Sequence, residues 1–150
     1  MLTVKVTSVF PASDREIFEK LQKLETLQYI AYPFATFNSV DGKSTLVWRA
    51  GEDAAFDFKL FGIIPFGIHR IRVIRFDLSN GILTHESNPH VPVWNHAIIL
   101  DRIDHDHARY SDVVDIEAGW KTIFVYLWAV CFYHHRQRKW QKLLKNDVIV

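Results

Sequence analysis

The sequence has little of what marks secreted, membrane-spanning or nucleic-acid-binding proteins. It contains a single cysteine, Cys131, so no internal disulfide can form and a disulfide-stapled secreted domain is excluded. The longest apolar stretch, Thr122 to Tyr133, is too short to span a bilayer as a helix. The first residues lack the apolar region of a signal peptide. We therefore expect a cytoplasmic protein.

The chain also has no large excess of positive or negative charge, since the net charge is +1. We therefore expect no nucleic-acid partner. No low-complexity tract interrupts the chain. What the sequence does have is 49% hydrophobic residues and 14% aromatic residues, enough to fill a core or to line a pocket. The length of 150 residues suits one domain, covering 1–150.

The N-terminal region predicts one strand and two short helices. Residues from Leu2 to Phe10 alternate as in a strand, and Pro11 ends it. Ser13 and Glu16 form the spacing of a capping box, which predicts a helix beginning there. A second short helix is expected around 25–30, before Pro33.

A succession of strand patterns follows, and turn signals such as Asp41-Gly42 and Asn80-Gly81 separate them. Together with the first strand they predict a curved antiparallel sheet of about six to seven strands. The expected strands are Phe34–Val40, Ser44–Ala50, Asp53–Phe61, Ile68–Leu78, Ile82–Ser87, Val93–Ile103 and Arg109–Glu117.

A long helix is expected from Gly119 to about Lys145. Its first half, Ile123 to Phe132, is apolar nearly all round, which indicates burial on both sides. One side would face the sheet, and the other would face more protein or an empty space. The element order therefore predicts an α+β fold in which a curved sheet wraps around the C-terminal helix, with two short helices after the first strand.

Local motifs in this order resemble a known superfamily. Phe10-Pro11-Ala12-Ser13 resembles its strand-to-helix junction, and Trp94-Asn95-His96 resembles the opening of a late strand. Tyr110–Ile116 and Phe132–Arg138 resemble its last strand and the basic end of its last helix. The chain is thus similar to the START-like, or Bet v 1-like (SRPBCC), superfamily, in its bacterial polyketide cyclase/dehydrase-like branch.

The resemblance implies a helix-grip fold with a central cavity for a sterol, lipid, polyketide or aromatic molecule. It implies no catalytic residue and no cofactor, because the superfamily has no universal catalytic motif. The apolar segment Ile63-Ile64-Pro65-Phe66 departs from the family pattern. This departure affects the expected mouth of the cavity more than the expected fold.

Candidate cavity residues come from the inward-facing positions of the predicted strands and from one stripe of the last helix. The alternative for each is ordinary core packing, and a one-residue slip in a strand would exchange the inward and outward sets. The candidates are Trp48, Phe56, Phe58, Ile71, Val73, His85, Trp94, His96, Phe124, Trp128 and Cys131.

An acid–base pair is the best candidate for catalysis. His96 with Asp112 or Asp115 on the neighbouring strand could move a proton on a carbonyl substrate. The alternative is a polar cross-strand pair on the sheet surface. His85 and Tyr110 are further candidates for a titratable group inside the cavity.

Arginines on one predicted strand could supply a ligand anchor. Arg70 and Arg72 share a face and Arg75 takes the other, so one of them could bind a carboxylate, or all could face solvent.

Eight histidines raise the question of a metal site. His105 and His107 lie in a predicted turn, while His134 and His135 diverge by about 100° on a helix. No convergent set of three or four ligands is apparent, so we expect no metal.

Two further surfaces could make contacts. The last helix carries Lys121, Arg136, Arg138, Lys139, Lys142 and Lys145, which form either an interaction patch or the usual cations of a helix C-terminus. The predicted apolar turn Phe61–Gly67 could touch a membrane or a protein through Ile63, Ile64 and Phe66, or gate ligand access.

The sequence therefore favours binding of a small hydrophobic ligand. The alternatives are a cyclase- or dehydratase-type enzyme using the same cavity, and a protein-interaction domain using the basic helix. The ligand and the oligomeric state are left open.

Overall fold

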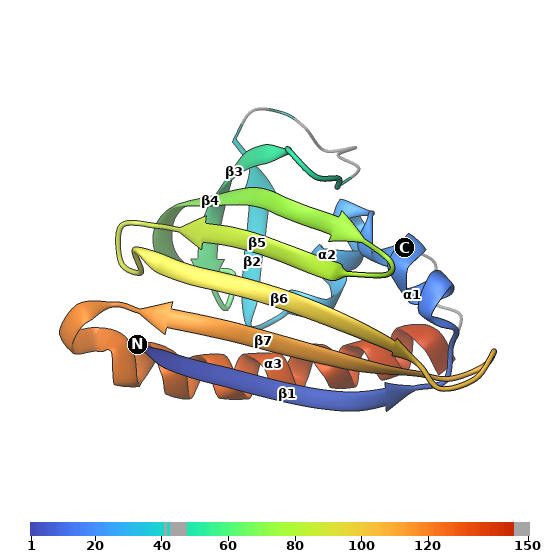
Figure 1. Ribbon diagram of the computed structural model, residues 1–150. Helices are drawn as coiled ribbons and strands as arrows, with labels where there is room; N and C mark the ends of the chain where they lie inside the picture. Colours follow the sequence, from blue (N-terminus) through green and yellow to red (C-terminus); the bar gives the residue numbers. More distant parts are fainter. Residues whose placement is uncertain (41, 43–47, 146–150) are drawn as a thin grey trace.

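The computed structural model describes residues 1–40, 42 and 48–145. Within them, one strand and two short helices precede six more strands and a long helix, as Figure 1 shows. The elements are β1 (Leu2–Phe10), α1 (Asp14–Leu21), α2 (Leu24–Ala31), β2 (Ala35–Ser39), β3 (Asp53–Leu60), β4 (Ile64–Asp77), β5 (Gly81–Ser87), β6 (Val93–Arg102), β7 (Ala108–Glu117), a 3₁₀ turn (Gly119–Lys121) and α3 (Thr122–Lys145).

The strands of the described residues form one antiparallel sheet in the order β1-β7-β6-β5-β4-β3-β2. The sheet curves around the core, and α3 runs along the inner side of β1 and β7 (Figure 1). The helices α1 and α2 lie toward the C-terminal end of α3. The predicted α+β, helix-grip architecture is confirmed.

The two short helices begin and end where the local sequence requires. The Ser13 hydroxyl accepts a hydrogen bond from the Glu16 backbone N–H at 3.1 Å, so the predicted cap forms at the start of α1. Ile17 and Leu21 face inward from this helix. Tyr32 adopts an extended conformation before Pro33, which ends α2.

Two predicted segments differ in the structure. The expected strand Ser44–Ala50 is irregular at 48–50, while Asp41 and residues 43–47 lie outside the described residues. The backbone N–H of Trp48 donates to the Gln22 carbonyl at 2.8 Å, which holds this segment beside the end of α1. The predicted turn Phe61–Gly67 is shorter than expected, because β4 already begins at Ile64.

A β-bulge in β4 changes which side chains face inward. Val73 pairs with Thr84 and Arg75 pairs with Leu83, which leaves Ile74 as an extra residue in the ladder. The bulge resets the alternation, so Arg75 lies on the exposed outer face with Arg70 and Arg72. The prediction that Arg75 takes the opposite face from the other two is therefore wrong.

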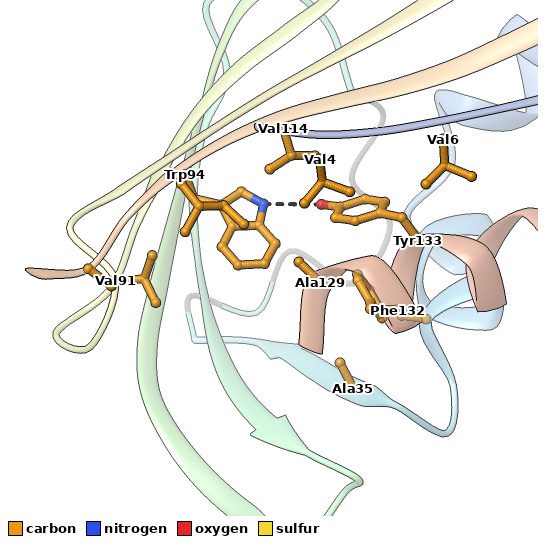
Figure 2. Close-up of a cluster of buried hydrophobic side chains, with 12 residues drawn as sticks. Val4, Val6, Ala35, Val91, Trp94, Val114, Ala129, Phe132 and Tyr133 are labelled. Atoms are coloured by element: carbon orange, nitrogen blue, oxygen red, sulfur yellow. Dashed lines mark hydrogen bonds between the residues drawn. The ribbon is translucent and has the colours of Figure 1, made fainter. Parts of the chain in front are cut away.

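Aromatic side chains hold the C-terminal half of α3 against the sheet and α1. Trp140 is fully buried and its ring lies 5.9 Å from Phe10 and 5.7 Å from Tyr110. Nearer the middle of the helix, Tyr133 points toward Trp94 on β6 (Figure 2), and the Trp94 indole N–H donates to its hydroxyl at 3.1 Å. These contacts explain why this half is buried despite its charged sequence.

The N-terminal half of α3 is not buried on both sides, so that prediction is wrong. Ile123, Phe124 and Leu127 are 48%, 63% and 56% exposed. The contacts of α2 and the residues after it with α3 include those of Tyr29 and Tyr32 with Lys139 and of Phe34 with Phe132, all beyond the exposed residues. In the part of the chain that the structure describes, no helix is both long and apolar enough to cross a bilayer.

Candidate functional site

A cavity of about 450 Å³ lies between the concave face of the sheet, α2 and the N-terminal half of α3. Its size falls within the range of small-molecule sites. Most of its wall is aliphatic or aromatic, with side chains from α2, β2 to β6 and α3. Strand alternation explains the wall on β3, where Phe56, Phe58 and Leu60 all face the cavity.

Most of the residues predicted to contact a ligand line this cavity. They are Trp48, Phe56, Phe58, Ile71, Trp94, His96, Phe124 and Trp128. Their position agrees with the predicted inward set, and their role in ligand binding stays a prediction.

Three predicted cavity residues lie elsewhere. Val73 packs in a buried cluster behind the wall, with Leu24 and Ala54. His85 is exposed on the outer face, because its neighbours Thr84 and Glu86 take the inward positions of β5. Cys131 is exposed on α3, since residues adjacent in a helix diverge by about 100° and its neighbour Phe132 takes the buried position.

One wall of the cavity is polar, and the sequence pattern had not indicated most of it. The Glu86 carboxylate accepts from His69 Nε2 at 2.8 Å and from the Thr84 hydroxyl at 2.6 Å. The Asn88 amide nitrogen lies 3.0 Å from His69 Nδ1, on the other side of the same ring. These four residues all line the cavity. Strand parity on β5 could have placed Thr84 and Glu86 on the inner face.

His96 and Asp112 form a buried pair beside this wall. His96 Nε2 lies 2.7 Å from Asp112 Oδ1, and Asp112 is fully buried. His96 is opposite Val114 in the ladder, so Asp112 is its diagonal neighbour. Asp115, the other predicted partner, instead accepts from Thr3 on the outer face. The alternative of a surface pair is therefore wrong.

The buried carboxyl groups of this wall have lowered pKa values. Burial alone would raise the pKa of Asp112, but the charge of Arg136 and the hydrogen bond from His96 outweigh it and hold this pKa below its ordinary value. Burial alone would also raise the pKa of Glu86. The hydrogen bond and the charge interaction with His69 outweigh burial, so the pKa of Glu86 lies below its ordinary value. Glu86 in the wall and Asp112 behind it are therefore both carboxylates at neutral pH.

Arg136 is a buried cation that lines the cavity. Only 8% of it is exposed, and its guanidinium lies over the Tyr133 ring at 5.2 Å. Arg136 therefore fits neither alternative given for the basic residues of this helix, an interaction patch or a solvated cation at the helix C-terminus. A signal was present in the sequence, because Arg136 lies four residues from both Phe132 and Trp140 on the buried stripe.

The other predicted polar sites are dispersed. His107 lies 3.0 Å from Asp104 within their exposed turn. His134 is exposed, while His135 contacts the Tyr32 carbonyl at 2.8 Å. In the ranges described, no three His, Cys, Asp or Glu side chains converge as metal ligands do. Tyr110 is fully buried behind the cavity wall, and its hydroxyl donates to Asp112 at 3.4 Å.

The lining includes exposed side chains at the start of α3, and we infer that the mouth of the cavity lies between them and the β3–β4 hairpin. Trp120 and Phe124 line it from one side, with 81% and 63% of their surfaces exposed. Phe66 lines it from the other and contacts His90 at 4.7 Å between ring centres. Ile63, of which 78% is exposed, lies beyond the lining.

Solved structures with the same arrangement share little sequence with this chain. A protein from Chromobacterium violaceum has a TM-score of 0.73 at 13% identity, covering 97% of this chain and 99% of that one. A START superfamily protein from Mycobacterium smegmatis has a TM-score of 0.68 at 14% identity, covering 97% and 99%. This chain has a START-like fold. No family model and no curated protein matches the sequence.

A third structural neighbour is named as a synthase. Norcoclaurine synthase from Thalictrum flavum, in complex with dopamine and hydroxybenzaldehyde, has a TM-score of 0.68 at 9% identity, covering 99% of this chain and 89% of that one. At this identity the likeness concerns the START-like fold alone.

Proposed function

We propose that this START-like chain binds a small hydrophobic molecule, such as a lipid, sterol, polyketide or aromatic compound, in its central cavity. The observation that carries the proposal is the cavity of about 450 Å³, with its mainly apolar wall and one cluster of polar groups. Ligand sites of this size and lining bury most of a small molecule's surface.

Native mass spectrometry of the protein purified from its host, followed by extraction and identification of anything bound, tests the proposal. We expect a co-purifying apolar molecule, or uptake of a fluorescent fatty acid or sterol by the purified protein. Ile71→Trp should reduce uptake, because Ile71 lines the cavity. Ile74→Trp is the matched control, since Ile74 lies on the same strand and is 44% exposed. An apo protein with no uptake would contradict the proposal.

The second candidate function is a cyclase- or dehydratase-type reaction on a polyketide-like substrate in the same cavity. It is favoured by the His96–Asp112 pair, whose short contact holds one imidazole nitrogen. If Nε2 donates to Asp112, Nδ1 is left as the basic nitrogen, 3.8 Å from Glu86 Oε2. A cavity-lining base of this kind could accept a proton from a bound substrate.

Turnover of the bound molecule separates the two functions. His96→Gln should abolish turnover while leaving binding within a few-fold, if His96 is the base. His85→Gln is the control, because His85 lies on the outer face and should not change turnover. Undiminished turnover in His96→Gln would exclude this mechanism.

The mouth residues are proposed to control ligand access, and to make any transient membrane or protein contact. Phe66 is half-buried at the mouth, so Phe66→Ser should accelerate both ligand association and dissociation. Ile63 and Ile64 are exposed and lie outside the lining, so Ile63→Ser should leave both rates unchanged. Stopped-flow fluorescence measures these rates, and identical rates in Phe66→Ser would contradict the gate.

A further inference from the structure

In the described part of the chain, the fully buried side-chain atoms of the cavity wall that lack a partner are all hydrogen-bond donors. Among the described residues, the buried unpartnered atoms of lining side chains are Nε and Nη2 of Arg136 and the indole nitrogens of Trp48 and Trp128. Each of these groups can only donate. A buried polar group without a partner is costly, so this wall is incomplete as it stands.

The two buried carboxylates at this wall, by contrast, already accept hydrogen bonds. Glu86 accepts from His69 and Thr84. Asp112 accepts from His96 on one oxygen and from the Gln137 amide on the other, at 3.1 Å. What the wall lacks is therefore an acceptor near Arg136.

Arg136 is the strongest of the unpartnered donors. It makes no ion pair within 4.0 Å among the described residues, and its guanidinium lies over the rings of Tyr133 and Phe132. A hydrogen-bond interaction with Tyr110 still leaves Nε and Nη2 without a partner. Hydrogen bonds from a charged donor are roughly twice as strong as those between neutral groups. An acceptor placed at this guanidinium would therefore contribute more to binding than one placed at either indole.

The charges around Arg136 indicate that the acceptor is neutral. Asp112 and Glu86 both interact with Arg136 electrostatically, so the cation is already balanced by anions that are held in place. A ligand carboxylate would add a third negative charge beside two buried ones, and like charges repel strongly where water is excluded. A carbonyl oxygen supplies the acceptor without that charge.

We infer that the ligand is a neutral apolar molecule bearing a carbonyl group, and that its carbonyl oxygen is bound by Arg136. The inference rests on the proposed binding function and names the substrate class for that cavity.

Three related fluorescent naphthalenes test it on the whole chain. The first is the propionyl dye prodan, the second is its propyl analogue without the carbonyl, and the third is the analogue with a carboxylate in place of the ketone. Titrations with each probe give the dissociation constants. We expect prodan to bind about 10- to 100-fold more tightly than the propyl analogue, the range that a hydrogen bond to a charged donor supports. The carboxylate should bind more weakly than prodan.

The variant Arg136→Met should remove the preference for prodan and leave the affinity for the propyl analogue within a few-fold. Retained binding of the propyl analogue shows that the variant still forms the cavity. Arg136→Lys keeps the charge and should retain part of the preference. In the unchanged protein, the infrared carbonyl stretch of bound prodan should lie below its value in hexane, which needs no variant to measure.

The outcomes separate the two proposals. Equal affinity of the unchanged protein for prodan and the propyl analogue, or an unshifted carbonyl stretch, overturns the role of Arg136 while the binding function stands. Tighter binding of the carboxylate overturns the neutral-ligand assignment. Failure of all three probes to bind contradicts the binding function for aromatic ligands, and the inference with it.

Discussion

The burial of the two halves of α3 is the opposite of what the hydrophobicity of their sequences predicts. The first half is almost entirely apolar, yet Ile123, Phe124 and Leu127 are exposed. The second half is rich in Lys and Arg, yet it buries Arg136 and Trp140. The difference shows that burial along this helix follows what packs against it. The sheet and α2 pack against α3, whereas Phe124 and Trp128 of the first half border the cavity, which Arg136 of the second half also lines.

The largest expected effect contrasts Trp140 of the second half with Trp120, which lies in the 3₁₀ turn just before the first half. Trp140→Ala should lower the free energy of unfolding by about 3–5 kcal/mol, because it empties a fully enclosed aromatic site. Trp120→Ala should change it by less than about 0.5 kcal/mol, since 81% of Trp120 is exposed. Urea unfolding followed by circular dichroism measures both. Equal losses would remove the contrast between the halves.

The next effect concerns the buried carboxylate against which the second half packs. Asp112→Asn should lower the free energy of unfolding by about 2–3 kcal/mol near neutral pH, because it weakens the contacts with His96 and Arg136. Asp115→Asn, on the outer face, should cost less than about 1 kcal/mol.

The same pair of variants should differ in pH dependence. The pKa of Asp112 is lowered by Arg136 and His96 against the opposing effect of burial, so its folded pKa lies below the ordinary value of 3.8. Its contribution is therefore present above that value and lost as pH falls through the folded pKa. Unfolding curves between about pH 7 and about pH 2.5 should show a flatter acid loss in Asp112→Asn than in Asp115→Asn. Parallel acid losses would show that Asp112 is not the group responsible.

A smaller effect is expected from the two glutamines of the second half. Gln137 donates to the Val6 carbonyl at 2.7 Å and to Asp112, and only 2% of it is exposed. Gln137→Ala should therefore cost about 1–2 kcal/mol in unfolding free energy. Gln141 makes a similar bond to the Val9 carbonyl at the surface, and Gln141→Ala should cost less than about 0.5 kcal/mol. A larger loss for Gln141 would contradict the burial difference.

The smallest effect tests the exposed face of the first half. Leu127→Ser should change the free energy of unfolding by no more than about 0.5 kcal/mol, as a substitution at an ordinary surface site does. Thermal unfolding measures this as a small shift in melting temperature. Leu143→Ser in the second half is the comparison, since 1% of Leu143 is exposed and its loss should be several-fold larger. A marked loss of stability in Leu127→Ser would mean that another molecule covers this face.

Local sequence determined the order of the elements and part of the cavity wall. Alternation in β3 and β6 placed Phe56, Phe58, Trp94 and His96 inward, because side chains of a strand point to opposite faces whatever the rest of the fold does. The cap at Ser13 likewise forms from neighbours in the chain.

Interactions between segments distant in sequence decided what alternation along one strand could not. The bulge at Ile74 arises from the pairing of β4 with β5, so alternation read along β4 alone misassigned Arg75. The choice of Asp112 over Asp115 depends on the register between β6 and β7. Arg136 was assigned to the surface by its charge, although the apolar residues four positions away on each side placed it on the buried stripe.

The sequence by itself thus determined an α+β chain with a curved sheet, a long last helix and an aromatic-rich interior, because these follow from periodicity and composition. Only the tertiary structure decided which side of α3 is covered, and which polar groups meet on the cavity wall. Those outcomes depend on sheet curvature and strand register, which bring Glu86, Asp112 and Arg136 together from three separate elements. The spacing of these residues along the chain does not predict that they come together.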